Sequence, residues 1–423
     1  MTAAILETAP ALANKRVVAA TVAGNAIEFY DFLCFGFFAV YISGAFFPGG
    51  DPTADLLKTL AVFWAGFLFR PLGGVVIGRY ADRAGRRPAM LLTIALITFG
   101  TMGVALTPGY ATLGPLAPAI LVFFRIVQGF ALGGEVGPAS VYLVEAAPPG
   151  RRGFYASWQI ASQGMAGVAA GLVGVGLAAT LSKQQLADWG WRVPFLLCLA
   201  LIPIAVLLRG EMPETLTHTA PSRAHPSVAM QIRYIALGVM LIVGGTVSTY
   251  VSSAYMSTFA IATLKLPPTV ALSATLIGGV STLVFALLGG WLGDHYGRKT
   301  LVLGPRVALI VLIWPLFAWL TAAPGALSLW VATIAISGLT ALSAGVGLVI
   351  LPELLPKATR AFGFAISYAL GVTIFGGSTP YVVTKLIDVT KDPASPAYYV
   401  ILTSLVTIAA LFALPETRGQ DLD

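Results

Sequence analysis

Five ionisable residues lie inside long apolar stretches of the first half of the sequence: Glu28, Asp31, Arg70, Arg125 and Glu135. An ionised side chain at the centre of a membrane-spanning helix costs about 2.5–3.5 kcal/mol on insertion scales, so such residues are kept for a partner or a function. Three acids and two bases leave one negative charge unpaired when all are ionised. Desolvation beside a second carboxylate favours the protonated form. Proton uptake would make this group neutral and more receptive to an anion.

Two of the acids share one helix face, because Glu28 and Asp31 are three residues apart. Counted from a helix start near Val17, they lie roughly 16–21 Å deep in a membrane. Arg70, counted back from Asp82 on a helix running the other way, lies about 18 Å above the same surface. The matching depths predict an ion pair between these two helices. The alternative, that all five charges form structural pairs that fix helix register, stays open.

Uncharged polar side chains complete the candidate site. Asn25 and Tyr30 flank the acid pair, and Gln159 and Gln163 lie four residues apart on one helix face. Such side chains hydrogen-bond across helices as often as they contact a ligand. The candidate substrate-binding residues are Arg125, Asn25, Tyr30, Gln159, Gln163, Tyr250, Tyr255 and Tyr368. The candidate proton-coupling residues are Asp31, Glu28, Glu135 and Arg70.

Membrane helices are the elements that must position these residues. Hydrophobic residues make up 57% of the chain and charged residues 10%, with a mean hydropathy of +0.86, which excludes an ordinary soluble domain. Apolar runs of roughly 20 residues, long enough to span a bilayer, recur throughout. We predict twelve spans, at 17–47, 56–80, 89–107, 115–142, 154–181, 191–209, 233–263, 269–293, 301–321, 326–352, 361–387 and 396–414.

Charge and cysteine usage exclude several function classes. Placing the N-terminus in the cytoplasm puts most Lys and Arg on that side, so the net charge of +7 reflects the positive-inside bias and not nucleic-acid binding. Residues 1–15 lack the apolar core of a cleavable signal peptide. Both Cys lie in spans and all three His in loops, so we expect neither a disulfide framework nor a metal site. Arg306 lies close enough to a span end to extend its guanidinium to the membrane surface.

The sequence contains neither a phosphate-binding glycine loop nor a set of catalytic side chains in the spans. We therefore expect no enzymatic activity, no catalytic residues and no cofactor. Glycine clusters such as Gly164, Gly167 and Gly171 are expected to permit close helix packing.

One motif occurs twice, half a chain length apart. The stretch 78–87 (GRYADRAGRR) returns at 290–299 as GWLGDHYGRK, each time after a long apolar run. Two matched hydrophobic halves are the plan of a transporter whose substrate site lies between the halves, near mid-membrane. We expect an N-terminal bundle of six helices at 1–209, a polar cytoplasmic linker at 210–232 and a C-terminal bundle of six helices at 233–423.

The repeated motif resembles the loop between spans two and three of the major facilitator superfamily, and residues 125–129 (RIVQG) resemble its fourth-span motif. The stretches 25–32, 69–73, 189–195 and 375–380 are similar to the metabolite:proton symporter family. Within it, the stretches around Trp158 and Glu135 and the pair Ser395–Pro396 are most similar to citrate–proton symporters. The resemblance implies an all-α fold of twelve transmembrane helices in two six-helix bundles, with alternating access and proton symport.

The resemblance also implies residue roles. Arg125 matches a buried arginine of the family, a carboxylate anchor or proton-path partner, and Glu28, Asp31 and Arg70 match positions associated with coupling. The motif residues match a cytoplasmic gate that stabilises the outward-facing state, although His295 replaces the first basic residue of the second copy. The gate residues are Gly78, Asp82, Arg83, Gly85, Arg86, Arg87, Gly290, Asp294, Gly297, Arg298 and Lys299.

We therefore expect a proton-coupled symporter of a small organic carboxylate, citrate or a related di- or tricarboxylate. It would act as a monomer in the inner membrane with both termini in the cytoplasm and the proton as its coupling ion. Shikimate, 2-oxoglutarate, aromatic acids and betaine or proline stay open as substrates. A uniporter or antiporter on the same fold is the main alternative, and a transporter-like receptor without net flux is a more remote one.

Overall fold

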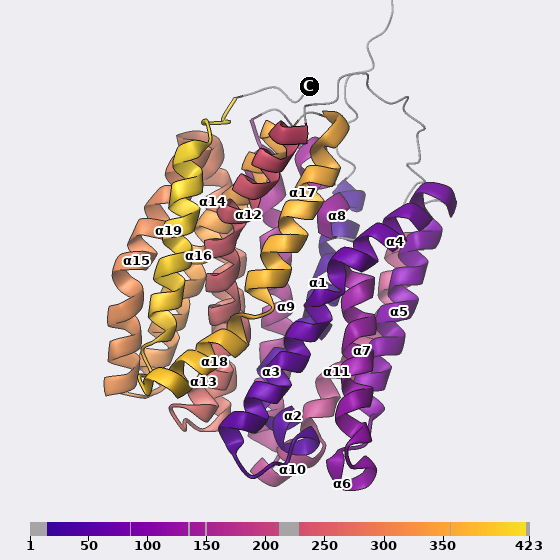
Figure 1. Cartoon of the computed structure of the whole chain (residues 1–423), viewed down its shortest axis with the longest axis vertical. Helices are drawn as coiled ribbons and strands as arrows, with labels where there is room; N and C mark the ends of the chain where they lie inside the picture. Colours follow the sequence, from indigo (N-terminus) through magenta and orange to yellow (C-terminus); the bar gives the residue numbers. More distant parts are fainter. Residues whose placement is uncertain are drawn as a thin grey trace, which may run out of the picture.

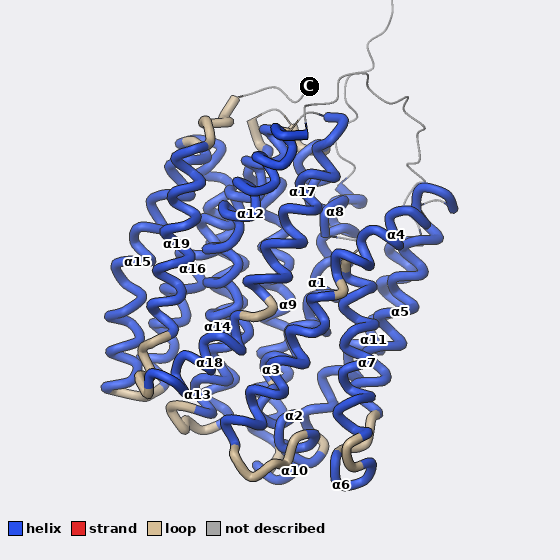
Figure 2. The backbone as a smooth tube through the Cα atoms, viewed as in Figure 1, coloured by secondary structure: helices blue, strands red, loops and turns tan. Residues whose placement is uncertain are grey.

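The computed structural model describes residues 15–84, 86–133, 136–148, 150–210, 228–355 and 357–419. Within these ranges the chain forms helices and connecting loops and no strand (Figure 2). Among the described residues, ten helical segments are long and apolar enough to cross a membrane, and two shorter apolar helices lie at Leu116–Leu132 and Gly190–Ala200. Together they match the twelve predicted spans and confirm the all-α membrane fold.

Several spans are built from two or more consecutive helices. In the first half the helices are α1 (Lys15–Phe37), α2 (Ala39–Phe46), α3 (Pro52–Leu68), α4 (Arg70–Ala84), α5 (Arg86–Leu106), α6 (Tyr110–Leu113), α7 (Leu116–Leu132), α8 (Val136–Glu145), α9 (Arg152–Thr180), α10 (Lys183–Asp188), the 3₁₀ turn η1 (Gly190–Arg192) and α11 (Val193–Gly210). In the second half they are α12 (Val228–Tyr250), the π-helix η2 (Val251–Tyr255), α13 (Met256–Ala262), α14 (Pro268–Tyr296), α15 (Arg298–Ala322), α16 (Ala326–Leu354), α17 (Lys357–Gly371), the π-helix η3 (Val372–Gly376), α18 (Thr379–Thr390) and α19 (Pro396–Ala413).

The helices from the two halves of the sequence gather on opposite sides of the molecule, α1 to α11 on one side and α12 to α19 on the other (Figure 1). The expected linker lies mostly outside the described residues, which resume at 228. The domain boundaries at 209 and 233 therefore stay a prediction.

Glycines allow α9 and α14 to pack closely where the two halves meet. A Cβ on Gly164 would lie 2.5 Å from the Leu283 nitrogen, and one on Gly153 would lie 2.7 Å from the Gly290 carbonyl oxygen. A Cβ on Gly171 would likewise collide with the backbone of Leu276. Small residues permit this close approach of helix backbones, as the sequence predicted.

At the end of the molecule that holds the repeated motif, Asp294 joins the two halves. Its carboxylate, on α14, accepts hydrogen bonds from the backbone N–H groups of Gly153 (2.8 Å) and Phe154 (2.9 Å) at the start of α9. These N–H groups have no partner within their own helix and carry the positive end of its dipole. A residue of the repeated motif in one half thus caps a helix of the other.

Arg298 extends this contact into a buried network. Its Nη1 lies 2.7 Å from Asp294 Oδ1 and its Nη2 lies 3.2 Å from Glu353 Oε1. The Thr417 hydroxyl donates a hydrogen bond of 2.6 Å to the same glutamate. Because each charge has an opposite charge and a hydrogen bond, the network can be buried at this end of the interface.

The second copy of the motif is also tied to the chain that follows α19. The backbone N–H groups of Arg298 and Lys299 donate to Glu416, which caps the start of α15, and Lys299 Nζ donates to the Leu414 carbonyl. Burial alone would raise the pKa of Glu416, but these N–H donors hold it below its ordinary value. Gly297 makes the turn between α14 and α15 with φ +103°, a conformation that favours glycine.

The first copy of the motif is described only in part. Arg83 is exposed at the end of α4. A Cβ on Gly78 would meet open space. Gly85 and the side chains of Asp82, Arg86 and Arg87 lie outside the described residues.

The opposite end of the interface is closed by hydrogen bonds to backbone carbonyls. Thr373, in η3, donates to the Phe67 carbonyl (3.1 Å), and Trp64 Nε1 donates to the Thr373 carbonyl (3.0 Å). Thr258 donates to the Gly36 carbonyl (3.2 Å). π-Helical turns occur frequently at functional sites. Hydrogen bonds thus join the two halves at both ends of the interface in this structure.

We predict that Asp294→Asn opens the motif end. An amide keeps the shape but removes the charge that holds both the α9 N-terminus and Arg298. With Cys34 and Cys198 replaced, labelling of Ser157→Cys by a membrane-impermeant maleimide should rise roughly 10-fold, the equivalent of one charged hydrogen bond. Asp388→Asn, which breaks only exposed pairs with lysines, is the control. Equal labelling in both variants would contradict the role of Asp294.

Candidate functional site

A buried chain of hydrogen bonds joins Asp31 on α1 to Arg125 on α7 through Gln128. Gln128 Nε2 donates to Asp31 Oδ2 over 2.6 Å, and Arg125 Nη1 donates to Gln128 Oε1 over 2.9 Å. Gln128 Nε2 also lies 3.1 Å from the Thr101 hydroxyl on α5. Asp31 and Gln128 are each 1% exposed and Arg125 is fully buried. A carboxylate and a guanidinium therefore face one another through one amide.

Several polar atoms of this chain are left without a partner. Asp31 Oδ1 and Arg125 Nε and Nη2 are buried and make no hydrogen bond within the described part of the protein. Buried polar atoms are almost always paired, so an exception calls for an explanation. An unpaired guanidinium edge can donate two hydrogen bonds to a carboxylate, and an unpaired carboxylate oxygen can accept a proton.

Phenylalanine rings surround the arginines. The Arg70 guanidinium lies 4.0 Å from the ring centre of Phe67 and 4.5 Å from that of Phe32. Arg125 lies 4.3 Å from the ring centre of Phe35 and 5.0 Å from that of Phe32. Such rings stabilise a desolvated cation without using its N–H groups. The arginines thus keep donors available for other acceptors.

Of the two acids expected near Arg70, Glu28 is the one that acts on it, while Asp31 faces Arg125. Arg125 is the charged group that acts on Asp31. Arg70 interacts electrostatically with Glu28 and with the phenols of Tyr250 and Tyr368. Matching depths along two helices do not fix the direction in which each side chain points, so they did not distinguish Glu28 from Asp31 as the partner of Arg70.

Asn25 and Gln159 are partners of one another across helices α1 and α9. Gln159 Nε2 donates to Asn25 Oδ1 over 3.0 Å, and Asn25 Nδ2 donates to the Ser162 hydroxyl over 2.5 Å. Of the two interpretations that the sequence left open, the structure favours interhelical bonding for this pair.

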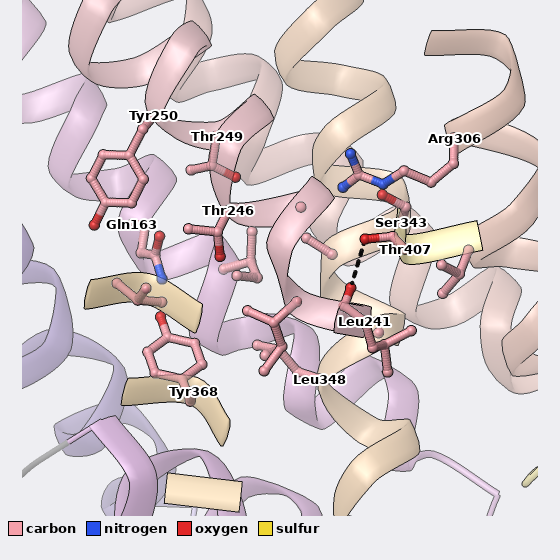
Figure 3. Close-up of a pocket in the computed structure, with 17 residues that line it drawn as sticks. Gln163, Leu241, Thr246, Thr249, Tyr250, Arg306, Ser343, Leu348, Tyr368 and Thr407 are labelled. Carbon is pink, nitrogen blue, oxygen red and sulfur yellow. Dashed lines mark hydrogen bonds between the residues drawn. The ribbon is translucent and has the colours of Figure 1, made fainter. Parts of the chain in front are cut away.

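A cavity of about 50 Å³ lies beside the cluster, between α9 and the helices of the second half. Gln163 lies between the phenols of Tyr250 and Tyr368 on one side of it (Figure 3). Its Nε2 is buried without a hydrogen-bond partner among the described residues. Three candidate residues, from α9, α12 and α17, therefore meet at one wall of a cavity.

Arg306 lies at the other side of this cavity, and the expectation that it reaches the membrane surface is wrong. It is 1% exposed, and its Nη1 donates to the Gly244 carbonyl and the Ser248 hydroxyl, both at 2.9 Å. These acceptors on α12 hold the guanidinium inward. In the sequence, the position of Arg306 inside an apolar run was the feature that could have indicated its burial.

Three candidate residues remain. Two of them do not line this cavity, and the third lies outside the described residues. Tyr255 is buried in the second half, where it packs against Phe259 with ring centres 6.1 Å apart. Tyr30 is buried beside Cys34, and its hydroxyl has no hydrogen-bond partner within the described ranges. Glu135 lies outside the described residues.

Gln128 is the functional candidate that sequence reasoning missed. It follows Arg125 by three residues and so lies on the same face of α7, inside the RIVQG motif. This spacing could have identified it. Within the described ranges, no group of three or more His, Cys, Asp or Glu side chains is placed to hold a metal ion.

Family models and known proteins of similar sequence match this chain over most of its length. The family model described as Major Facilitator Superfamily matches residues 33–300, and the model described as Sugar (and other) transporter matches residues 217–423. The chain is 38% identical to a citrate-proton symporter of Salmonella typhi over 92% of this chain and 91% of that protein. It is 36% identical to a citrate-proton symporter of Klebsiella pneumoniae over 92% and 88% of the two chains. It is 32% identical to the alpha-ketoglutarate permease of Escherichia coli (strain K12) over 94% and 93%.

A solved structure has the same fold. The proton:xylose symporter XylE, bound to 6-bromo-6-deoxy-D-glucose, superposes with a TM-score of 0.78 over 98% of each chain at 18% sequence identity. Three observations agree. The motif occurs twice, the described residues hold twelve apolar helical segments, and relatives match over nine tenths of the chain. This chain belongs to the major facilitator superfamily of transporters, and citrate–proton symporters are among its relatives.

Proposed function

We propose that the protein is a proton-coupled symporter of small organic carboxylates, with citrate or a related di- or tricarboxylate as substrate. The observation that carries this proposal is the buried chain Asp31–Gln128–Arg125, which offers a proton acceptor and a carboxylate-binding group linked by one amide. Relatives named as citrate-proton symporters support the substrate class.

Arg125 is the proposed substrate anchor. Its Nε and Nη2 are buried without a partner in the described residues, and together they form one edge of the guanidinium. A planar guanidinium edge binds both oxygens of a carboxylate, which an ammonium does not. The neighbouring Arg70 adds a second positive charge that acts on the same region.

Asp31 is the proposed proton-coupling residue, with Glu28, Arg70 and Glu135 in supporting roles. While Asp31 is ionised, its charge partly satisfies Arg125 and repels an incoming carboxylate. A proton on Asp31 removes that charge, so Arg125 becomes free to bind the substrate. Gln128 hydrogen-bonds to both Asp31 and Arg125. A change in the charge of one of these groups therefore alters the hydrogen bonding of the other. Proton binding and anion binding therefore favour each other.

The relatives favour a carboxylate over a zwitterion. Identity is 36–38% to the citrate-proton symporters and 32% to the alpha-ketoglutarate permease, against 28% to a proline/betaine transporter of Escherichia coli (strain K12). We propose that Gln163, Tyr250 and Tyr368 contact the bound substrate from the cavity wall.

The chain is a multi-pass membrane protein of the inner membrane. We propose that both termini and the repeated motif face the cytoplasm, so that the Asp294–Arg298 network is the cytoplasmic gate. We further propose that the protein works as a monomer without catalytic activity, that it needs no cofactor and that the proton is the coupling ion.

Uptake by the purified protein in proteoliposomes tests the function. Radiolabelled citrate should accumulate when the outside is acidic relative to the lumen, and tricarballylate should compete where betaine does not. Accumulation blocked by betaine alone, or uptake that ignores the pH gradient, would contradict the proposal. Unlabelled 2-oxoglutarate and shikimate in the same competition series distinguish the remaining substrates.

We predict that Arg125→Lys impairs transport although it keeps the charge. Lysine offers neither the bidentate edge nor the bond to Gln128, so citrate uptake should fall roughly 10- to 100-fold. Arg192→Lys is the matched control, because Arg192 bonds only backbone carbonyls at the end of the molecule opposite the motif. Near-normal uptake by the Arg125 variant would show that it is not the anchor.

We predict that Asp31→Asn separates transport from proton coupling. The amide cannot take up the proton, so accumulation driven by a pH gradient should be lost while citrate counterflow persists. Asp388→Asn, which alters a partly exposed carboxylate paired with Lys385 and Lys391, should leave both activities intact. Full gradient-driven accumulation by Asp31→Asn would reject Asp31 as the coupling residue.

A further inference from the structure

Arg306 is a buried cation to which the proposed function assigns no role. It lies on α15, which begins at Arg298, and so is about 12 Å along the helix from the motif end. It is 1% exposed, and α15 is long and apolar enough to cross a membrane. A charged side chain at such a position is costly unless it has a partner or faces a polar space.

The guanidinium of Arg306 is only partly paired. Its Nη1 donates to the Gly244 carbonyl and the Ser248 hydroxyl, both on α12. Its Nε is buried without a hydrogen-bond partner among the described residues. A purely structural arginine would be expected to use all its buried donors, because unpaired buried polar atoms are rare. The free donor therefore calls for an acceptor.

No described acid of the second half supplies that acceptor. These acids are Asp294, Glu353, Asp388, Asp392 and Glu416. Three of them bond to Arg298 at the motif end, and the other two lie at the C-terminal end of α18 and just beyond it, at the opposite end of the molecule. No described carboxylate acts on the charge of Arg306. The described residues thus leave this buried charge without a counter-charge.

Arg306 faces the cavity described above. Its guanidinium and Ser343 lie on one side of the cavity (Figure 3). Gly245 leaves space in front of the guanidinium, because a Cβ there would lie 3.1 Å from Nη2. Thr246 and Thr249 bring hydroxyl groups to the same cavity. Arg306 thus presents hydrogen-bond donors to a partly polar space.

The size and lining of the cavity limit what it can hold. A volume of about 50 Å³ has room for about three to five water-sized groups. The rest of the lining is mainly apolar. A lining of this kind strengthens the attraction of the arginine for one negative charge and offers nothing to balance a second. The cavity therefore suits a small anion with a single charge.

We infer that Arg306 holds a small monovalent anion in this cavity, either an inorganic ion of the size of chloride or a single small carboxylate. Neither Arg70 nor Arg125 lines the cavity, so this site is separate from the Asp31–Gln128–Arg125 chain. The residues around the guanidinium lie on α12 and α16, within the second half. The anion would therefore stay with that half as a bound ligand while the two halves move, and it would not be transported.

The melting temperature of the purified full-length protein in detergent tests the site. Sodium chloride should raise it by roughly 2–5 °C, in a saturable manner, over sodium gluconate of equal ionic strength. Gluconate is too large for the cavity, and a ligand that binds only the folded state stabilises that state. Sodium formate in the same series distinguishes the sources: the salt that saturates at the lower concentration contains the preferred anion. No saturable shift with either small anion would overturn the inference.

Arg306→Gln should abolish the shift. Arg192→Gln is the matched control and should retain it, because Arg192 donates to three backbone carbonyls. A full shift in Arg306→Gln, or its loss in both variants, would overturn the inference.

Gly245→Ala covers the case in which Arg306→Gln does not fold. This variant retains the charge and places a methyl group against Nη2, so the chloride concentration for half the effect should rise roughly 10-fold, the equivalent of one hydrogen bond. An unchanged concentration would overturn the inference.

Discussion

Ionised groups are costly to hold inside a membrane, and the rest of this structure depends on how that cost is met. The protein meets it at Asp31 and Arg125 by placing the Gln128 amide between them, so that each charge has a hydrogen-bonding partner and neither is fully neutralised. The Phe32 and Phe35 rings stabilise the guanidinium from its faces. A pair bound directly would be a stable structural ion pair. A pair bound through an amide leaves atoms that can respond to a proton or an anion.

The two ends of the interface between the halves are closed by different chemistry. At the motif end the contacts involve charges, with Asp294 capping α9 and Arg298 joining it to Glu353. At the opposite end they involve hydroxyl and indole groups on backbone carbonyls, as for Thr373 on the Phe67 carbonyl. Between them α9 and α14 pack through glycines. Ends held by independent bonds can open one at a time, as alternating access requires.

The sequence predicted the fold well because hydropathy and the repeated motif are strong, additive signals along the chain. It also named Gln163, Tyr250 and Tyr368 as candidate binding residues, and the structure brings these three to one cavity wall. It did not show that Glu28 acts on Arg70 while Asp31 faces Arg125, because residue spacing gives depth along a helix but not the neighbour that a side chain faces. It misplaced Arg306 for a related reason: distance to a span end does not reveal that Gly244 and Ser248 on another helix hold the guanidinium inward.

The most direct test of the central claim is proton movement caused by substrate. Citrate would be added outside proteoliposomes that hold the purified protein, at equal pH on both sides, while a dye reports external pH. Coupling through Asp31 and Arg125 predicts that the external medium becomes more alkaline with wild-type protein and does not change with Asp31→Asn. Citrate entry through wild-type protein without any proton movement would contradict the account.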